Sequence, residues 1–138
     1  MSLFKVFDIA GSGMSAQSVR LNTTASNLAN ANSVSTTEEG AYRSRQPLFQ
    51  AALDRAAGGN DATVGVRVLG IMESSAEPQR LFEPGNPQAD EEGYVYKSNV
   101  NIAEEMANMI SASRSFQNNI EVLNTSKDLM MRTLNLGR

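Results

Sequence analysis

The sequence of 138 residues contains no cysteine, no histidine and no tryptophan. Without Cys and His the chain has no thiolate nucleophile, no imidazole base and no zinc site of the usual kind. Aromatic residues make up only 6% of the chain and apolar residues 41%, so a core is possible but not a rich one. These absences exclude the commonest catalytic and metal sites. We therefore expect no enzyme activity, no metal site and no cofactor.

A strong charge of either sign is missing as well. The chain has 12 Lys or Arg and 15 Asp or Glu, a formal net charge of −3. Nucleic-acid and anionic-membrane surfaces need concentrated Lys and Arg, so this balance argues against both. The charged residues among residues 1–32 are Lys5, Asp8 and Arg20 alone. A helical terminus with so little charge usually meets another protein surface, because a solvated helix face normally carries more.

Long apolar runs are also absent. No stretch approaches the roughly 20 apolar residues of a membrane-spanning helix. A cleavable secretory signal needs an uninterrupted apolar run after a basic start, whereas Lys5 and Asp8 interrupt the first apolar residues. We expect neither membrane insertion nor a cleavable signal peptide. By these ordinary rules alone, such a chain stays in the cytosol.

An apolar residue recurs every seven positions in residues 1–32, which predicts a first long helix. This line consists of Phe7, Met14, Leu21 and Leu28. The positions three residues before each are Phe4, Gly11, Ser18 and Ala25. A helix of about 29 residues would be about 43 Å long, and small residues beside the line would let another helix approach. Gly11 and Gly13 weaken it, so we expect poor order until something packs against it.

Residues 99–138 carry the strongest structural pattern and predict a second long helix that packs with the first. Steps of four and three residues lead through Ile102, Met106, Met109, Ser113, Phe116, Ile120, Leu123, Lys127, Met130 and Leu134. Eight of these ten positions are apolar, which predicts a helix over about residues 102–134. Asn101, with Glu104 three residues later, is a variant of the capping box, and Gly137 is placed to end the helix.

Residues 33–98 indicate a small extended β insert between the two helices. Val64, Val66 and Val68 alternate with Gly65 and Arg67, which is a strand pattern. Residues 42–49 and 94–96 are shorter strand candidates, with turns expected at residues 58–61 and 84–87. The predicted fold class is therefore mainly α: two long terminal helices form a coiled-coil-like pair, and a β insert separates them.

Three patterns that could carry chemistry have simpler structural interpretations. Residues 11–16 match a nucleotide-binding G-x-G-x-x-A, but no apolar second strand follows and the heptad line runs through the glycines. Glu104 and Glu105 are adjacent on a helix and point about 100° apart, so they do not converge on one substrate. Their place in the first turn suits the helix dipole. The acidic run at residues 90–92 lacks the alternating ligands of a calcium loop and predicts a solvated turn.

The asparagines near the end of the first helix are harder to explain as local structure. Asn27, Asn30 and Asn32 are poor helix formers, and a helix cap accounts for only one of them. We expect their amides to bond to the backbone of a neighbouring subunit.

Several longer motifs resemble the bacterial flagellar rod and hook proteins, the axial proteins of the flagellum. At the N-terminus these are Ser12-Gly13-Met14-x-Ala16-Gln17, Arg20-Leu21 and Ala25-Ser26-Asn27-Leu28-Ala29-Asn30. The middle motifs are Glu38-Glu39-Gly40-Ala41-Tyr42-Arg43 and Pro84-Gly85-Asn86-Pro87-x-Ala89-Asp90-x-x-Gly93-Tyr94-Val95. The C-terminal motifs run from Asn99 to Met106, from Ser111 to Gln117 and from Leu123 to Thr125, and they resemble proximal rod proteins closely. Asn86 and Ser98 depart from the pattern, where His and Pro are common.

The resemblance implies a structural subunit of the proximal rod, the periplasmic drive shaft that transmits torque and surrounds the export channel. It implies passage through the flagellar type III export apparatus without a cleavable signal, and contact with itself, other proximal and distal rod proteins and the adaptor to the membrane ring. The expected subunit-interface residues are Phe7, Met14, Leu21, Asn27, Leu28, Asn30, Ile102, Met106, Met109, Phe116, Ile120, Leu123, Met130 and Leu134. The alternative is a soluble helical adaptor or export chaperone that binds a partner's helix.

Overall fold

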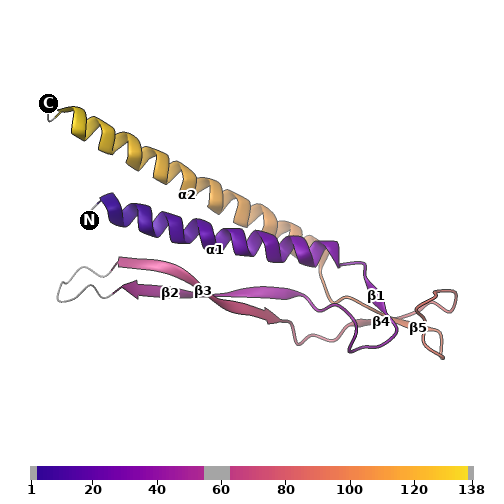
Figure 1. Ribbon diagram of the computed structural model, residues 1–138. Helices are drawn as coiled ribbons and strands as arrows, with labels where there is room; N and C mark the ends of the chain where they lie inside the picture. Colours follow the sequence, from indigo (N-terminus) through magenta and orange to yellow (C-terminus); the bar gives the residue numbers. More distant parts are fainter. Residues whose placement is uncertain (1–2, 55–62, 137–138) are drawn as a thin grey trace.

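The computed structural model describes residues 3–54 and 63–136, and it shows an elongated molecule of two helices and five strands (Figure 1). In chain order the elements are α1 (Leu3–Ala29), β1 (Val34–Ser35), β2 (Arg45–Asp54), β3 (Thr63–Glu73), β4 (Gln79–Phe82), β5 (Tyr94–Lys97) and α2 (Ile102–Leu136). The helices contain 27 and 35 residues. The two expected terminal helices and the β-rich region between them are present, and the chain is about half helical.

Helix α1 forms the middle layer of the molecule. Figure 1 shows α2 along one side of α1 and the β2–β3 hairpin along the other, and α1 contacts all three elements. The two helices run in opposite directions and diverge towards the chain termini (Figure 1). The N-terminal segment, expected to be poorly ordered alone, is thus covered on two sides by its own chain.

The strands form two separate antiparallel sheets. The β2–β3 hairpin pairs Arg45 with Glu73 at its open end, and its register shifts between Leu48 and Phe49. The second sheet has the order β1-β5-β4 and lies beyond the end of α1 (Figure 1). In the loop before β5, Gly93 has a φ of 83°, a left-handed conformation that glycine adopts without strain.

The sequence located the larger elements better than the shorter ones. The strand expected at residues 42–49 begins at Arg45 and continues to Asp54, whereas β1 and β4 were not expected at all. The turn at residues 84–87 is present, closed by a bond from the Asn86 amide to the Glu83 carbonyl oxygen at 3.0 Å. The turn expected at residues 58–61 and the helix end expected at Gly137 lie outside the described residues.

The cap of α2 forms as its sequence predicts. The Asn101 side-chain oxygen accepts bonds from the backbone amides of Ala103 at 3.1 Å and Glu104 at 3.4 Å. Two of the amides that every helix leaves unpaired at its start are satisfied in this way. Glu104 and Glu105 follow in the first turn, where their negative charges interact favourably with the helix dipole.

Small side chains make up most of the buried interior. The buried apolar residues of the described chain are Ala10, Ala16, Ala31, Ala41, Val95 and Ala112. Its largest fully buried side chains are Val95, Asn27 and Ser98. Many large apolar side chains lie on the surface instead, among them Phe4, Leu69, Ile71, Met106 and Ile110. Large exposed apolar patches mark interaction sites on folded proteins, so this distribution directs attention to the surfaces of α2 and the hairpin.

Candidate subunit interface

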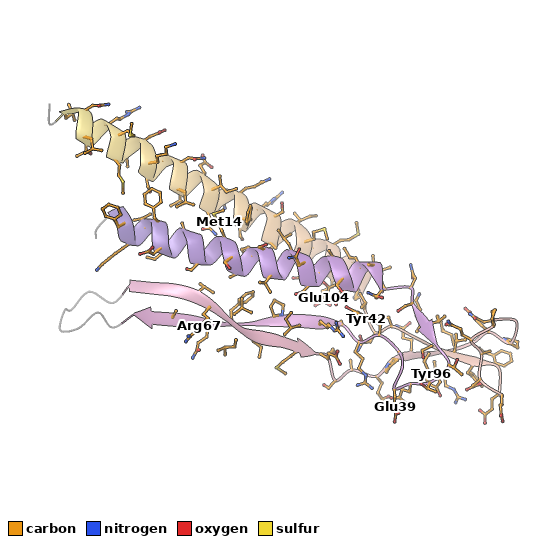
Figure 2. All side chains as sticks on the ribbon, viewed as in Figure 1. Met14, Glu39, Tyr42, Arg67, Tyr96 and Glu104 are labelled. Atoms are coloured by element: carbon orange, nitrogen blue, oxygen red, sulfur yellow. The ribbon has the colours of Figure 1, made fainter. Side chains whose placement is uncertain are left out.

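The seam between α1 and α2 repeats every seven residues on both helices. On α1 the apolar line of Phe7, Met14, Leu21 and Leu28 is half-buried. The residues three positions later, which are Ala10, Gln17, Thr24 and Ala31, are buried or half-buried. Figure 2 shows Met14 on the side of α1 that faces α2. The sequence had placed the companion line three positions earlier, but Phe4, Gly11, Ser18 and Ala25 are all exposed.

Helix α2 shows the same arrangement. Met109, Phe116, Leu123 and Met130 are half-buried, and their covered companions are Glu105, Ala112, Asn119 and Ser126. Ile102, seven residues before Met109 on the same line, is exposed, and so are the companions that the sequence favoured, Met106, Ile120 and Leu134. On both helices, therefore, the row of small or polar residues faces the other helix and is covered by it. The reason is distance: small side chains let two backbones approach, and bulky ones at these positions would hold them apart.

Two contacts show how closely the helices approach. A Cβ atom added at Gly13 would lie 2.9 Å from the side-chain nitrogen of Asn119, which is tighter than ordinary packing allows. Further along, the Arg20 guanidinium donates to the Asn108 side-chain oxygen at 2.8 Å. Close backbone contact and a charge-assisted hydrogen bond thus join α1 to α2 at separate points.

Asn27 joins α1 to the start of the hairpin. Its amide nitrogen donates to the Arg45 carbonyl oxygen at 2.8 Å, and its oxygen accepts from the Arg45 amide at 2.9 Å and the Tyr42 hydroxyl at 3.0 Å. With 1% of its surface exposed, Asn27 mimics a strand edge for β2. Its amide is thus occupied within the chain, and Asn30 likewise donates to the Ser26 carbonyl oxygen at 2.9 Å. A contact of either residue with a neighbouring subunit stays a prediction.

Ser12 provides a second contact between α1 and the hairpin. Its hydroxyl oxygen accepts a bond from the Val66 amide at 3.1 Å and donates to the Ile9 carbonyl oxygen at 2.8 Å. A Cβ at Gly65 would lie 3.0 Å from this oxygen, so glycine permits the close approach. Ala16 and Thr23 are each four residues from Ser12 or Asn27, share that face of α1 and are buried. Nothing in the sequence pattern pointed to Ser12, because Val66 is 54 residues away.

The exposed apolar side chains lie on two surfaces. Helix α2 presents Ile102, Met106, Ile110, Ile120, Val122, Leu129, Met131, Leu134 and Leu136. The hairpin presents Leu48, Phe49, Val66, Leu69, Ile71 and Met72. The sequence named four of these α2 residues as interface residues, which stays a prediction. It named no hairpin residue, because period-two alternation predicts one covered face and here both faces keep exposed apolar residues.

The smaller sheet has a polar, well-bonded surface. Arg80 donates to Glu92 at 2.8 Å and stacks over the Tyr94 ring at 3.8 Å from its centroid. Desolvation would lower the pKa of Arg80, but its hydrogen bond to the Glu92 carboxylate and the charges of Tyr96, Glu92 and Tyr94 raise the pKa overall. The Asp90 carboxylate accepts bonds from the Glu92 and Tyr94 amides at 3.0 and 2.8 Å. Asp90 therefore shapes this loop, and Glu91 and Glu92 lie exposed in the turn that the acidic run predicts.

The described residues hold no arrangement suited to catalysis. Residues 11–16 lie inside α1, so no strand precedes them and a dinucleotide fold is excluded. Glu104 is exposed whereas Glu105 is buried, and each belongs to the first turn of α2, where a carboxylate stabilises the helix. Among described residues, no group of three or more His, Cys, Asp or Glu could hold a metal ion. Neither described helix is long and apolar enough to cross a membrane.

The fold and its surfaces define a class of protein: an elongated structural subunit with a thin internal core and apolar surfaces suited to assembly. Comparisons with known proteins identify the family. The family model described as flagella basal body rod protein matches residues 7–35, and the one described as flagellar basal body rod FlgEFG protein C-terminal matches residues 91–136. The chain is 53% identical to the flagellar basal-body rod protein FlgC of Yersinia enterocolitica and to that of Salmonella typhimurium, over the full length of each chain. It is 43% identical to the FlgC of Buchnera aphidicola from Acyrthosiphon pisum over 99% of each chain.

The chain therefore belongs to the FlgC family of flagellar basal-body rod proteins. It is a structural subunit of the basal-body rod and not an enzyme. The resemblance found in its motifs is confirmed, including the assignment to the proximal rod.

Proposed function

We propose that the chain polymerises with copies of itself and with other proximal and distal rod proteins into the periplasmic drive shaft around the export channel. The observation that carries this proposal is the row of exposed apolar side chains on α2, of which Met106 is 55% and Leu134 70% exposed. A solvated helix would expose charge at such positions. Covering them with neighbouring helices removes apolar surface from water, at about 25 cal/mol per Å².

In the assembled rod, the α1–α2 seam becomes part of a larger coiled-coil-like bundle. The half-buried lines of Phe7, Met14, Leu21, Leu28, Met109, Phe116, Leu123 and Met130 serve the seam, and Ile102, Met106, Ile120 and Leu134 serve neighbouring subunits. Residues 1–32 and 99–138 form this bundle, and residues 33–98 project from it as the insert. The repeat of seven residues on both helices supports this arrangement.

The same proposal includes how the chain reaches the rod. It passes through the flagellar type III export apparatus without a cleavable signal peptide and meets the adaptor that joins the rod to the membrane ring. The sparse charge of residues 1–32 supports this route. A soluble adaptor or chaperone remains the alternative function, and the full-length relation to rod proteins favours the subunit.

Ile120→Asp tests the proposal in a deletion strain complemented with variant protein. Ile120 is 37% exposed in the single chain, so the unfolding midpoint of the purified variant should change little. In the rod its carboxylate would be buried without a partner. We expect motility on soft agar to be lost and electron microscopy of basal bodies to show no completed rod.

Asn118→Asp is the matched control, because it adds the same charge two residues away, on nearly the opposite side of α2. Normal rods are expected with this variant. Normal rods with Ile120→Asp would contradict the proposed interface. If both variants left the rods intact but secretion of another flagellar protein failed, the result would indicate an export chaperone instead.

A further inference from the structure

A cleft lies where the second half of α1, the start of α2 and the start of β2 meet. Its volume is about 400 Å³, and Arg20, Arg45, Phe49, Glu104, Glu105 and Asn108 line it. Figure 2 labels Glu104 at this junction. The lining mixes charges of both signs, so the question is which of these charges have partners within the chain.

Both arginines of the cleft are already bound. Arg20 donates to Asn108, as described above, and Arg45 donates from two nitrogens to one Glu73 oxygen at 3.1 and 2.9 Å. The opposite holds for Glu105. Its side chain is 5% exposed, it lines the cleft, and its carboxylate makes no hydrogen bond or ion pair with any residue in the described ranges.

A buried carboxylate without a partner is costly, because water no longer solvates its charge fully. A cation entering the cleft would relieve that cost. A metal ion is disfavoured by the donor set, since the described residues bring no three acidic groups together. An ammonium or guanidinium group on a protein side chain needs only one carboxylate and suits the mixed polar lining.

The chain itself offers such groups at a distance from the cleft. Arg114, Lys127 and Arg132 lie exposed on α2, and none of them forms an ion pair within residues 3–54 and 63–136. Of the acids of α2 only Glu105 is buried, whereas Glu104, Glu121 and Asp128 are exposed like the three bases. Two copies displaced along the helix direction can match these charges, as in a head-to-tail contact.

We propose that Glu105 receives a basic side chain from α2 of a neighbouring copy of this chain. This rests on the polymerisation proposed above and adds the position and chemistry of one contact. Glu105 specifies how far adjacent copies are displaced, because only one displacement brings a base to the cleft.

Glu105→Gln tests the contact, with Glu121→Gln as control, because Glu121 is an exposed acid of α2 outside the cleft and the charge change is identical. For purified Glu105→Gln, we expect an unfolding midpoint equal to or above that of the original chain. The amount incorporated into isolated basal bodies should fall about tenfold or more. Glu121→Gln should change neither quantity. A lower midpoint for Glu105→Gln would show an internal partner, and normal incorporation would also overturn the proposal.

Exchanging the charges identifies the partner. Glu105→Lys should prevent assembly, and assembly should return when it is combined with one of Arg114→Glu, Lys127→Glu or Arg132→Glu. Rescue by none of the three would overturn the assignment to a second copy and indicate a base on another rod protein. Failure of Ile120→Asp to block assembly concerns polymerisation itself, whereas normal assembly of Glu105→Gln removes only this contact.

Discussion

Asn27 is a polar residue at a buried position, where three hydrogen bonds to other parts of the chain hold its side chain. Removing its side chain by Asn27→Ala leaves two part-buried backbone groups of Arg45 and the Tyr42 hydroxyl without this partner, each at about 1 kcal/mol. We expect the free energy of unfolding in urea to fall by about 3 kcal/mol. Asn22→Ala, at an exposed position of the same helix, should stay within about 0.5 kcal/mol. Equal effects of both substitutions would show that α1 does not depend on the hairpin.

Gln17 illustrates the opposite case. Its side-chain oxygen is buried and has no hydrogen-bond partner among the described residues. Gln17→Met keeps the size of the side chain and removes the unpaired acceptor. The free energy of unfolding should therefore rise by about 1 kcal/mol, measured as a higher urea midpoint. A lower midpoint would mean that the amide is satisfied in the free protein.

At the scale of single elements, the two glycines of α1 have different environments. A Cβ at Gly11 would meet nothing within 4 Å, whereas one at Gly13 would displace the Asn119 side chain. Gly11→Ala should raise the free energy of unfolding by about 1 kcal/mol through helix propensity alone. Gly13→Ala should raise the free energy of unfolding by less, because the Asn119 side chain must move to make room for the added methyl group. Equal gains in urea unfolding would show that this part of the seam adjusts freely.

The sequence predicted the two helices because an apolar residue at every seventh position is a local pattern that is typical of a helix. It did not determine which side of that line is covered, since Phe4 and Ala10 flank Phe7 equally well in pattern. The choice depends on how near the other helix lies. Strand β4 was not predicted, because its four residues do not alternate between apolar and polar side chains. All four are exposed in the structure. Asn27 was singled out, but its partner Arg45 lies 18 residues away in sequence and belongs to another element.

At the scale of the whole molecule, Phe116 and Ile120 separate folding from assembly. Phe116 is half-buried in the seam, so an acid there affects the single chain as well as the rod. For Phe116→Asp we expect the free energy of unfolding in urea to fall by several kcal/mol, and we expect absent rods and no swimming. Glu91→Ala, on the exposed loop before β5, should be tolerated in all three measurements. Rods built with Phe116→Asp would show that the seam is open to water.

The two ends of the molecule differ. Both chain termini lie near one end, and the β1–β5–β4 sheet lies at the other (Figure 1). Such a subunit cannot stack with identical contacts in both orientations. Copies joined in the same orientation make head-to-tail contacts, and where these do not close into a ring they form an open series with two unlike tips. Elongation of that series is directional: the tip that receives an arriving subunit always presents the same surface, and the opposite tip is the one suited to anchorage.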